Sequence, residues 1–285
     1  MTYEDAGVCY ERADAFKRAA QCAGRETTWY LNLFGFREVW ESWGESARLV
    51  ETPNNYLAHV GEGIGTKHLV ADAMHQIIGK SFYDHIAQDA VAMAVNDLIT
   101  LGAFPFSIAM YLEVNGSDWF LDENRSQDLI DGWKNACMLA RAAWGVGETA
   151  VVESGKVSLS CSAMGVIQPK NRLMIGSKIK DGDVIVLVKS SGIHANGLTL
   201  ARKVANKVPF RYETRLGDGR SYGEALLDPT IIYVSLVEDC LNRGVPLHYA
   251  VHITGHGWRK LMRSPQPFSY IIETIPEPQP VFSFI

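Results

Sequence analysis

The seven residues from Gly61 to Lys67, Gly-Glu-Gly-Ile-Gly-Thr-Lys, constrain this chain more than any other stretch. Glycine adopts positive φ angles and lets a ligand approach the backbone, and successive N–H groups in such a turn form an anion-binding concavity. Thr66 adds a donor and Lys67 a point charge, both suited to phosphate oxygens, while Glu62 is a carboxylate of the kind that carries Mg²⁺. The spacing matches neither a Walker A loop nor a Rossmann fingerprint. Two interpretations are open, an ordinary glycine-rich hairpin turn and a phosphate-binding turn.

The composition is that of an ordinary globular protein. The chain has 285 residues, of which 47% are hydrophobic and 21% charged, and its length favours two domains. The formal net charge of -5 gives no reason to expect nucleic-acid binding. The 5 cysteines form no C-x-x-C pair, which fits a reducing compartment. Since no signal peptide or membrane span is recognisable, we expect a cytoplasmic protein without a membrane or nucleic-acid partner.

Residues 82–101 give the clearest helical pattern, which ends at Gly102. Asp89 and Asn96 are seven positions apart and lie on one face of this helix, with Asp97 beside them. Acidic and amide groups on an apolar helix need a partner if they are buried. A metal ion or ligand is one such partner, and a solvent-exposed helix edge is the alternative.

The rest of the chain alternates between helical and extended patterns without a simple βαβ repeat, which predicts mixed α+β layers. A linker is expected at 169–180, and the predicted domains are 1–168 and 169–285. A small-residue turn with one carboxylate, Glu148, is expected at 145–150. Helices are expected at 1–26, 66–79, 122–143, 198–206, 226–242 and 258–263, and strands at 56–60, 105–114, 157–167, 184–188, 251–257 and 270–273.

Two further segments allow alternative interpretations. The loop from Ser190 to Gly197 lies between a predicted strand and a predicted helix, which is a place for an anion. His194 in this loop would donate to a phosphate or shuttle a proton, or would be an ordinary hydrogen-bonded loop histidine. Residues 27–50 are rich in aromatic side chains, and we favour core or interface packing for them over a ligand-binding wall.

Taken together, these motifs resemble the aminoimidazole ribonucleotide synthetase (phosphoribosylformylglycinamidine cyclo-ligase) family. Seven ordered blocks carry the resemblance and cover nearly the whole chain. They are Tyr3 to Val8, Gly61 to Lys67, Asp89 to Leu98, Gly147 to Ala150, Ser190 to Gly197, Leu227 to Thr230 and His252 to Gly255.

The resemblance implies an ATP- and Mg²⁺-dependent closure of the imidazole ring of aminoimidazole ribonucleotide from formylglycinamidine ribonucleotide in purine biosynthesis. It implies a two-domain mixed α/β fold (α+β) that forms a homodimer through an N-terminal sheet or barrel, with a C-terminal α/β domain shorter than in the family. It also implies roles for individual residues. They are, for catalysis, His194, Lys67 and Asn196; for ATP binding, Gly63, Gly65, Thr66, Lys67, Asn96, Asp97, Gly147, Glu148 and Thr149; and for the metal, Glu62, Asp97 and Glu148.

This sequence departs from the family pattern at several positions. Glu62 stands where the family usually has Asp, and His256 interrupts a run of glycines. Residues 27–50 lack the family's glycine-rich loop, which contacts ligand. The alternatives that follow are another ATP-using enzyme of the same superfamily, such as a small-molecule kinase or a hydrogenase-type maturation factor, and a non-catalytic nucleotide-binding paralogue.

Overall fold

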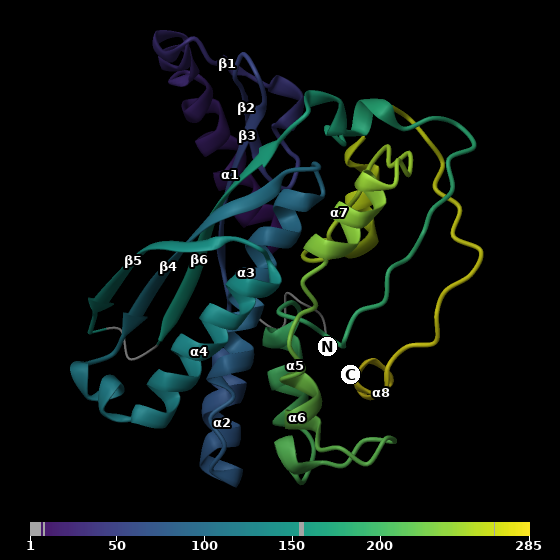
Figure 1. The fold of residues 1–285 in the computed structure, drawn as a ribbon. Coiled ribbons are helices and arrows are strands. Elements are labelled where there is room, and N and C mark those ends of the chain that lie inside the picture. Colours follow the sequence, from purple (N-terminus) through teal and green to yellow (C-terminus); the bar gives the residue numbers. More distant parts are fainter. Residues whose placement is uncertain (1–6, 8, 154–156, 265) are drawn as a thin grey trace.

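A computed structural model of the chain describes residues 7, 9–153, 157–264 and 266–285. The N-terminal block from Tyr3 to Val8 lies outside the described residues, except for Gly7. The architecture is a mixed α/β arrangement built on one six-stranded sheet (Figure 1). Its strands are β1 Arg37–Glu38, β2 Arg48–Glu51, β3 Tyr56–Gly63, β4 Phe104–Val114, β5 Ala143–Val151 and β6 Ser158–Ile167.

The strands lie in the order β1-β2-β3-β6-β4-β5. All neighbours are antiparallel except β4 and β5, which are parallel. Along β6 the side chains alternate between the two faces of the sheet, so that Leu159, Cys161 and Ala163 are buried while Ser160 and Ser162 face the other side. The sheet therefore has one core face and one open face that is exposed to solvent.

Helices α3 and α4 cover the core face. The described helices are α1 Tyr10–Arg25, α2 His68–Ile78, α3 Tyr83–Ile99, α4 Glu123–Leu139, α5 Leu198–Ala205, α6 Tyr222–Leu226, α7 Val234–Asn242 and α8 Pro280–Phe284. Nearly every residue of α3 is buried, because the sheet, α4, α2 and α7 all pack against it. The helices predicted around 66–79, 82–101 and 122–143 are confirmed by α2, α3 and α4.

The turn predicted at 145–150 is wrong, because this segment lies within β5. Close packing against β4 explains why glycine occupies positions 145 and 147 of this strand. A Cβ on Gly145 would lie 2.8 Å from the Ser107 hydroxyl, and one on Gly147 would lie 3.3 Å from the Met110 carbonyl oxygen. Close approach to β4 therefore selects small residues in a strand. The turn predicted at the glycine-rich run is likewise shorter than expected, since β3 continues to Gly63.

The strands predicted at 184–188, 251–257 and 270–273 are not formed in the structure. Figure 1 shows the chain after β6 and the chain before α8 as long extended segments at the edge of the molecule. The alternating exposure of 184–188 matches a strand pattern, with Val184 85% and Val186 77% exposed. A strand also needs a partner for its backbone groups, and these segments form no ladder with one another.

The helix predicted at 226–242 is interrupted between α6 and α7. Pro229 lacks a backbone donor, and the carbonyl groups of neighbouring residues are engaged by side chains of the first half of the chain, as described below. The predicted helix at 258–263 is present as a 3₁₀ helix, η7, Gly257–Arg263.

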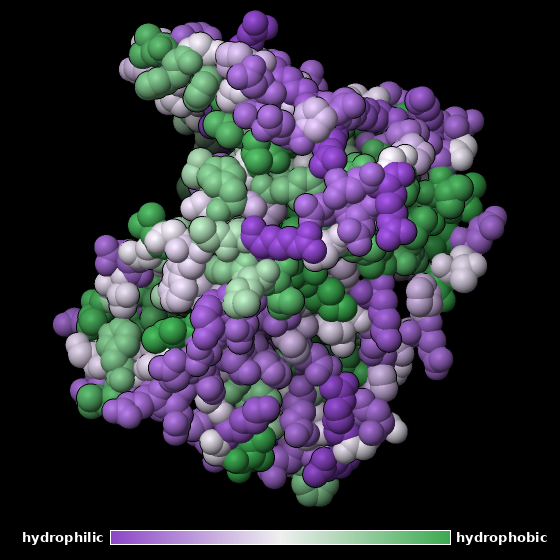
Figure 2. All heavy atoms as spheres, in the orientation of Figure 1, coloured by the Kyte–Doolittle hydropathy of each residue, from purple (hydrophilic) through white to green (hydrophobic). Residues whose placement is uncertain are grey.

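The aromatic segment at 27–50 lies at the surface of this chain and not in its core. Trp29, Phe34 and Trp40 are each more than half exposed. Figure 2 shows hydrophobic atoms gathered at the upper end of the molecule, where this segment lies, and along the edge formed by the extended segments. Among the described residues, no helix combines the length and the apolar character that crossing a bilayer requires.

Candidate functional site

Two carboxylates, Glu62 and Asp97, lie within electrostatic range of each other near the ends of β3 and α3. Ala58, Val60 and Glu62 alternate along the core face of β3, so Glu62 is directed toward α3. Asp97 lies in the last turn of that helix and is 5% exposed. Burial and, to a lesser extent, the charge of Asp97 raise the pKa of Glu62 to about 7, against the opposing charges of Lys260 and Lys17. The two carboxylates therefore repel each other in a partly desolvated place.

The segment after α7 brings a histidine and a lysine to these carboxylates. His252 donates from Nδ1 to Asp97 Oδ1 at 2.8 Å, and both side chains are 7% exposed. Lys260, in η7, is 6% exposed and donates to the Thr254 hydroxyl. Burial lowers the pKa of Lys260, whereas Asp97 and Glu62 act in the opposite direction. Glu62, Asp97, His252 and Lys260 are called the carboxylate cluster below.

Lys67 follows the glycine-rich run and is fully buried. Its ammonium lies 2.7 Å from Asp89 Oδ2 and donates to the carbonyl oxygen of Asp228 at 2.7 Å. Burial lowers the pKa of Lys67, and the two aspartates oppose this effect. The lysine thus joins α2, α3 and the chain after α6, and its charge is already matched within the protein.

Polar residues along α3 hold the segment that follows α6. His85 donates to the Leu227 carbonyl, and Gln88 donates to the Thr230 carbonyl at 2.9 Å. Asp89 accepts from the backbone N–H and the hydroxyl of Thr230. These groups are buried or half-buried and do not lie at a solvent-exposed helix edge. The partners that the structure shows for Gln88 and Asp89 are backbone groups, the Thr230 hydroxyl and Lys67, not a ligand.

Asn96 is the last of these polar residues along α3 that bind the segment after α6. Its amide donates to the Ile231 carbonyl at 2.8 Å and its oxygen accepts from the Tyr233 N–H at 3.0 Å. Both ends of the side chain are thus used by the backbone of the second half of the chain. Its predicted contact with ATP stays a prediction.

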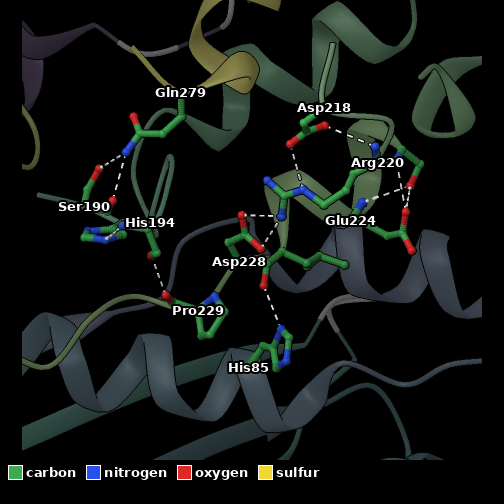
Figure 3. Close-up of polar contacts among 12 residues, drawn as sticks. His85, Ser190, His194, Asp218, Arg220, Glu224, Asp228, Pro229 and Gln279 are labelled. Carbon is green, nitrogen blue, oxygen red and sulfur yellow. Dashed lines mark hydrogen bonds and ion pairs between the residues drawn. The ribbon is translucent and has the colours of Figure 1, made fainter. Parts of the chain in front are cut away.

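The outer side of the same segment is held by a surface network (Figure 3). Arg220 donates to both carboxylate oxygens of Asp228 at 2.8 Å and to Asp218 at 2.9 Å. Figure 3 also shows Gln279 directed at Ser190, to which it donates twice. The chain before α8 therefore fixes the start of the Ser190–Gly197 loop.

His194 lies in that loop with a left-handed backbone, φ 56°. Its Nε2 accepts from the Ser191 N–H at 3.1 Å. Burial, together with the charges of Lys67 and His252, lowers the pKa of His194 to about 4. The imidazole is therefore neutral at pH 7. It lies near enough to Lys67 and to His252 of the carboxylate cluster for their charges to affect its pKa. Asn196, from the same loop, donates to Met93 Sδ at 3.4 Å.

Three further residues of the glycine-rich run are Gly63, Gly65 and Thr66. Gly65 has φ 68°, and a Cβ on Gly65 would meet no atom within 4 Å, so its surroundings leave space. Gly63 lies on the face of β3 opposite Glu62. Thr66 Oγ1 lies 3.5 Å from Thr199 Oγ1 of α5, which brings the end of the run to the start of that helix.

Glu148 lies apart from the carboxylate cluster within one chain. The register places Gly63, Ser160, Tyr111 and Glu148 in one row across β3, β6, β4 and β5. Three strand spacings separate Glu148 from Gly63, roughly 14 Å. Glu148 is exposed, and its carboxylate accepts a hydrogen bond from the Thr149 N–H. Neither Glu148 nor Thr149 contacts Asp97 through a hydrogen bond in the described part of the chain. Among the described residues no group of three or more His, Cys, Asp or Glu converges as a metal cage.

Sequence reasoning missed two members of the cluster. His252 was noticed only as part of a motif, and Lys260 lies outside every motif. The signal for His252 was a histidine directly before a Thr-Gly turn. Nothing local in the sequence marks Lys260, because its burial depends on tertiary packing.

The fold is that of a mixed α/β protein, with a cluster of charged side chains near β3, α3 and the chain after α7. Two family models match, the AIR synthase related protein N-terminal domain over residues 44–167 and its C-terminal domain over 180–261. The chain belongs to the AIR synthase-related family.

Relatives of known name cover most of the chain. It is 37% identical to the phosphoribosylformylglycinamidine cyclo-ligase of Thermococcus kodakarensis, over 97% of this chain and 78% of that protein. It is 34% identical to the protein of the same name from Methanocaldococcus jannaschii, over 100% of this chain and 78% of that protein. A solved structure described as AaThiL complexed with AMPPCP and TMP matches at 16% identity with a TM-score of 0.49, covering 69% of this chain and 56% of that one.

Proposed function

We propose that this protein is a phosphoribosylformylglycinamidine cyclo-ligase, which uses ATP to close the imidazole ring of aminoimidazole ribonucleotide from formylglycinamidine ribonucleotide. The similarity to relatives of that name over nearly the whole chain carries the proposal. The carboxylate cluster supports it, because an enzyme that transfers a phosphoryl group between two anionic reactants needs fixed charges at the point of reaction.

The expected chemistry has two steps. The formyl amide oxygen is phosphorylated, and an amidine nitrogen then attacks the same carbon and displaces phosphate. The protein contributes mainly positioning and electrostatics. The His194 imidazole is neutral and a weak base, with a pKa of about 4. It therefore orients the substrate by hydrogen bonds and is poorly matched to general-base work at pH 7.

The residues of the cluster fit a magnesium ion. Mg²⁺ is usually held by one or two carboxylates together with substrate phosphates, and the mutual repulsion of Glu62 and Asp97 is what a divalent cation relieves. Glu62 and Asp97 would hold the ion, which would neutralise phosphate charge. The glycine run and Thr66 would lie against the phosphates.

The open face of the sheet supports a homodimer. Tyr111 and Met164, on this face, are 39% and 42% exposed, which is unusual for large side chains in the middle of a sheet. Glu148 lies on the same face. If the open faces of two chains pair, Glu148 of one chain would come close to the nucleotide site of the other. We also propose domains at 1–168 and 169–285, in keeping with the two family models, and a cytoplasmic location.

A substrate panel read by ADP release tests the proposal. The purified chain with Mg²⁺ and ATP is incubated with formylglycinamidine ribonucleotide, thiamine monophosphate or no acceptor. Release of ADP with formylglycinamidine ribonucleotide alone is the expected result. Release with another acceptor would assign a different enzyme of the superfamily, and no release with any acceptor from a chain that binds ATP would indicate a non-catalytic paralogue.

A further inference from the structure

Lys260 is a buried lysine whose position the proposed function does not require. Lysine is almost never fully buried unless it is paired, and Lys260 is only 6% exposed. Its charged neighbours of opposite sign are Asp97 and Glu62, on two different elements of the first half of the chain. Lys260 thus adds a positive charge within electrostatic range of the two carboxylates proposed to hold the metal.

The hydrogen-bonding capacity around Lys260 is only partly used. An ammonium group has three donors, and within the described part of the chain the Thr254 hydroxyl is the acceptor shown for it. In the same cluster, His252 Nε2 is buried and has no hydrogen-bond partner among the described residues, although Nδ1 is bonded to Asp97. Unused buried polar groups cost stability. The spare N–H donors of Lys260 are suited to oxygen acceptors of a ligand, whereas Nε2 of a neutral His252 ring is an acceptor, since Nδ1 carries the proton.

We propose that Lys260 is a phosphate-binding residue of the nucleotide site, contacting an oxygen of the bound polyphosphate beside the carboxylates. The inference rests on the proposed function, since it assumes that Glu62 and Asp97 face the nucleotide. The charges support it: two carboxylates alone repel a polyphosphate, and the ammonium of Lys260 offsets part of their charge and offers a phosphate oxygen a positive group to contact.

The test is equilibrium binding of Mg·ADP, measured by calorimetry on the full chain. Lys260→Met should weaken binding roughly 10- to 100-fold, the loss expected for one hydrogen bond to a charged group. Lys260→Arg keeps the charge and should retain most of the affinity. Lys134→Met is the matched control, because Lys134 is an exposed lysine of α4 paired with Asp131, and its affinity should equal that of the wild type.

A different role of Lys260 gives different results. If it serves only as a counter-ion for Glu62 and Asp97, Lys260→Met will bind Mg²⁺ alone more tightly and Mg·ADP no more weakly, which overturns the inference. Equal losses in Lys260→Met and Lys260→Arg, together with an altered circular dichroism spectrum, also overturn it in favour of a structural role. A wild-type chain that does not bind Mg·ADP rejects the proposed function and this inference together.

Discussion

His194 combines a strained backbone with a suppressed charge. Its φ of 56° lies in the left-handed region, which asparagine tolerates better than most residues. Its pKa is lowered to about 4 by burial and by the nearby charges of Lys67 and His252. His194→Asn therefore keeps the backbone conformation while removing the titrating group.

The pKa of His194 has a consequence for stability. Because the unfolded chain binds a proton near pH 6.5 and the folded chain only near pH 4, stability is lost as the pH falls through this window. Between pH 7 and pH 5 the wild type should lose about 2 kcal/mol more than His194→Asn. Urea unfolding of both proteins at the two pH values measures this, and parallel losses would contradict a neutral buried histidine.

The ion pair of Lys67 and Asp89 is fully buried, whereas that of Lys134 and Asp131 is exposed. Removing one member of a buried pair leaves an uncompensated charge, so Asp89→Asn should cost about 3–5 kcal/mol of unfolding free energy. Asp131→Asn should cost less than about 1 kcal/mol.

Chemical denaturation of these two variants measures the difference. The double variant Lys67→Met/Asp89→Asn should recover part of the loss, because no unpaired charge remains. Equal small losses for Asp89→Asn and Asp131→Asn would show that Lys67 is not held as described.

At the level of elements, the contact between α3 and α4 is set by one glycine. A Cβ on Gly132 would lie 2.5 Å from the Cα and from the carbonyl oxygen of Asp84. Alanine favours a helix by about 1 kcal/mol over glycine, but here the helices would have to separate. Gly132→Ala should therefore destabilise the protein by roughly 2 kcal/mol or more.

Gly24 of α1 provides the control for Gly132. A Cβ there would lie 3.4 Å from the Trp43 ring, an ordinary contact, so Gly24→Ala should be neutral or slightly stabilising. Thermal unfolding of both variants is the measurement. A neutral Gly132→Ala would mean that α3 and α4 are farther apart than the structure has them.

Local pattern predicted α2, α3, α4, β4 and β6, because each buries a face whose period is visible in the sequence. It failed where structure depends on distant partners. Residues 145–150 look like a turn until β4 lies beside them, and 184–188 look like a strand although no neighbour pairs with them. Glu62 and Asp97 were predicted from motifs, whereas Lys260 was not, because only tertiary packing buries it.

At the level of the whole molecule, the open face of the sheet predicts association of two chains. A charge at Met164 should oppose such pairing, because it would be buried without a partner. Met164→Lys should be monomeric, while Met138→Lys should behave like the wild type, since Met138 is 71% exposed on α4. Sedimentation equilibrium measures the mass of each variant. A monomeric wild type, or a dimeric Met164→Lys, would contradict a dimer formed through this face.

The most direct test of the account is the stoichiometry of the reaction together with its dependence on Asp97. With formylglycinamidine ribonucleotide, Mg²⁺ and ATP, the wild type should form one aminoimidazole ribonucleotide and one phosphate for each ADP. Asp97→Asn should lose at least about 100-fold in rate while keeping its fold, because it removes one carboxylate proposed to hold the metal. ADP formation without ring closure, or full activity of Asp97→Asn, would contradict a cyclo-ligase centred on the carboxylate cluster.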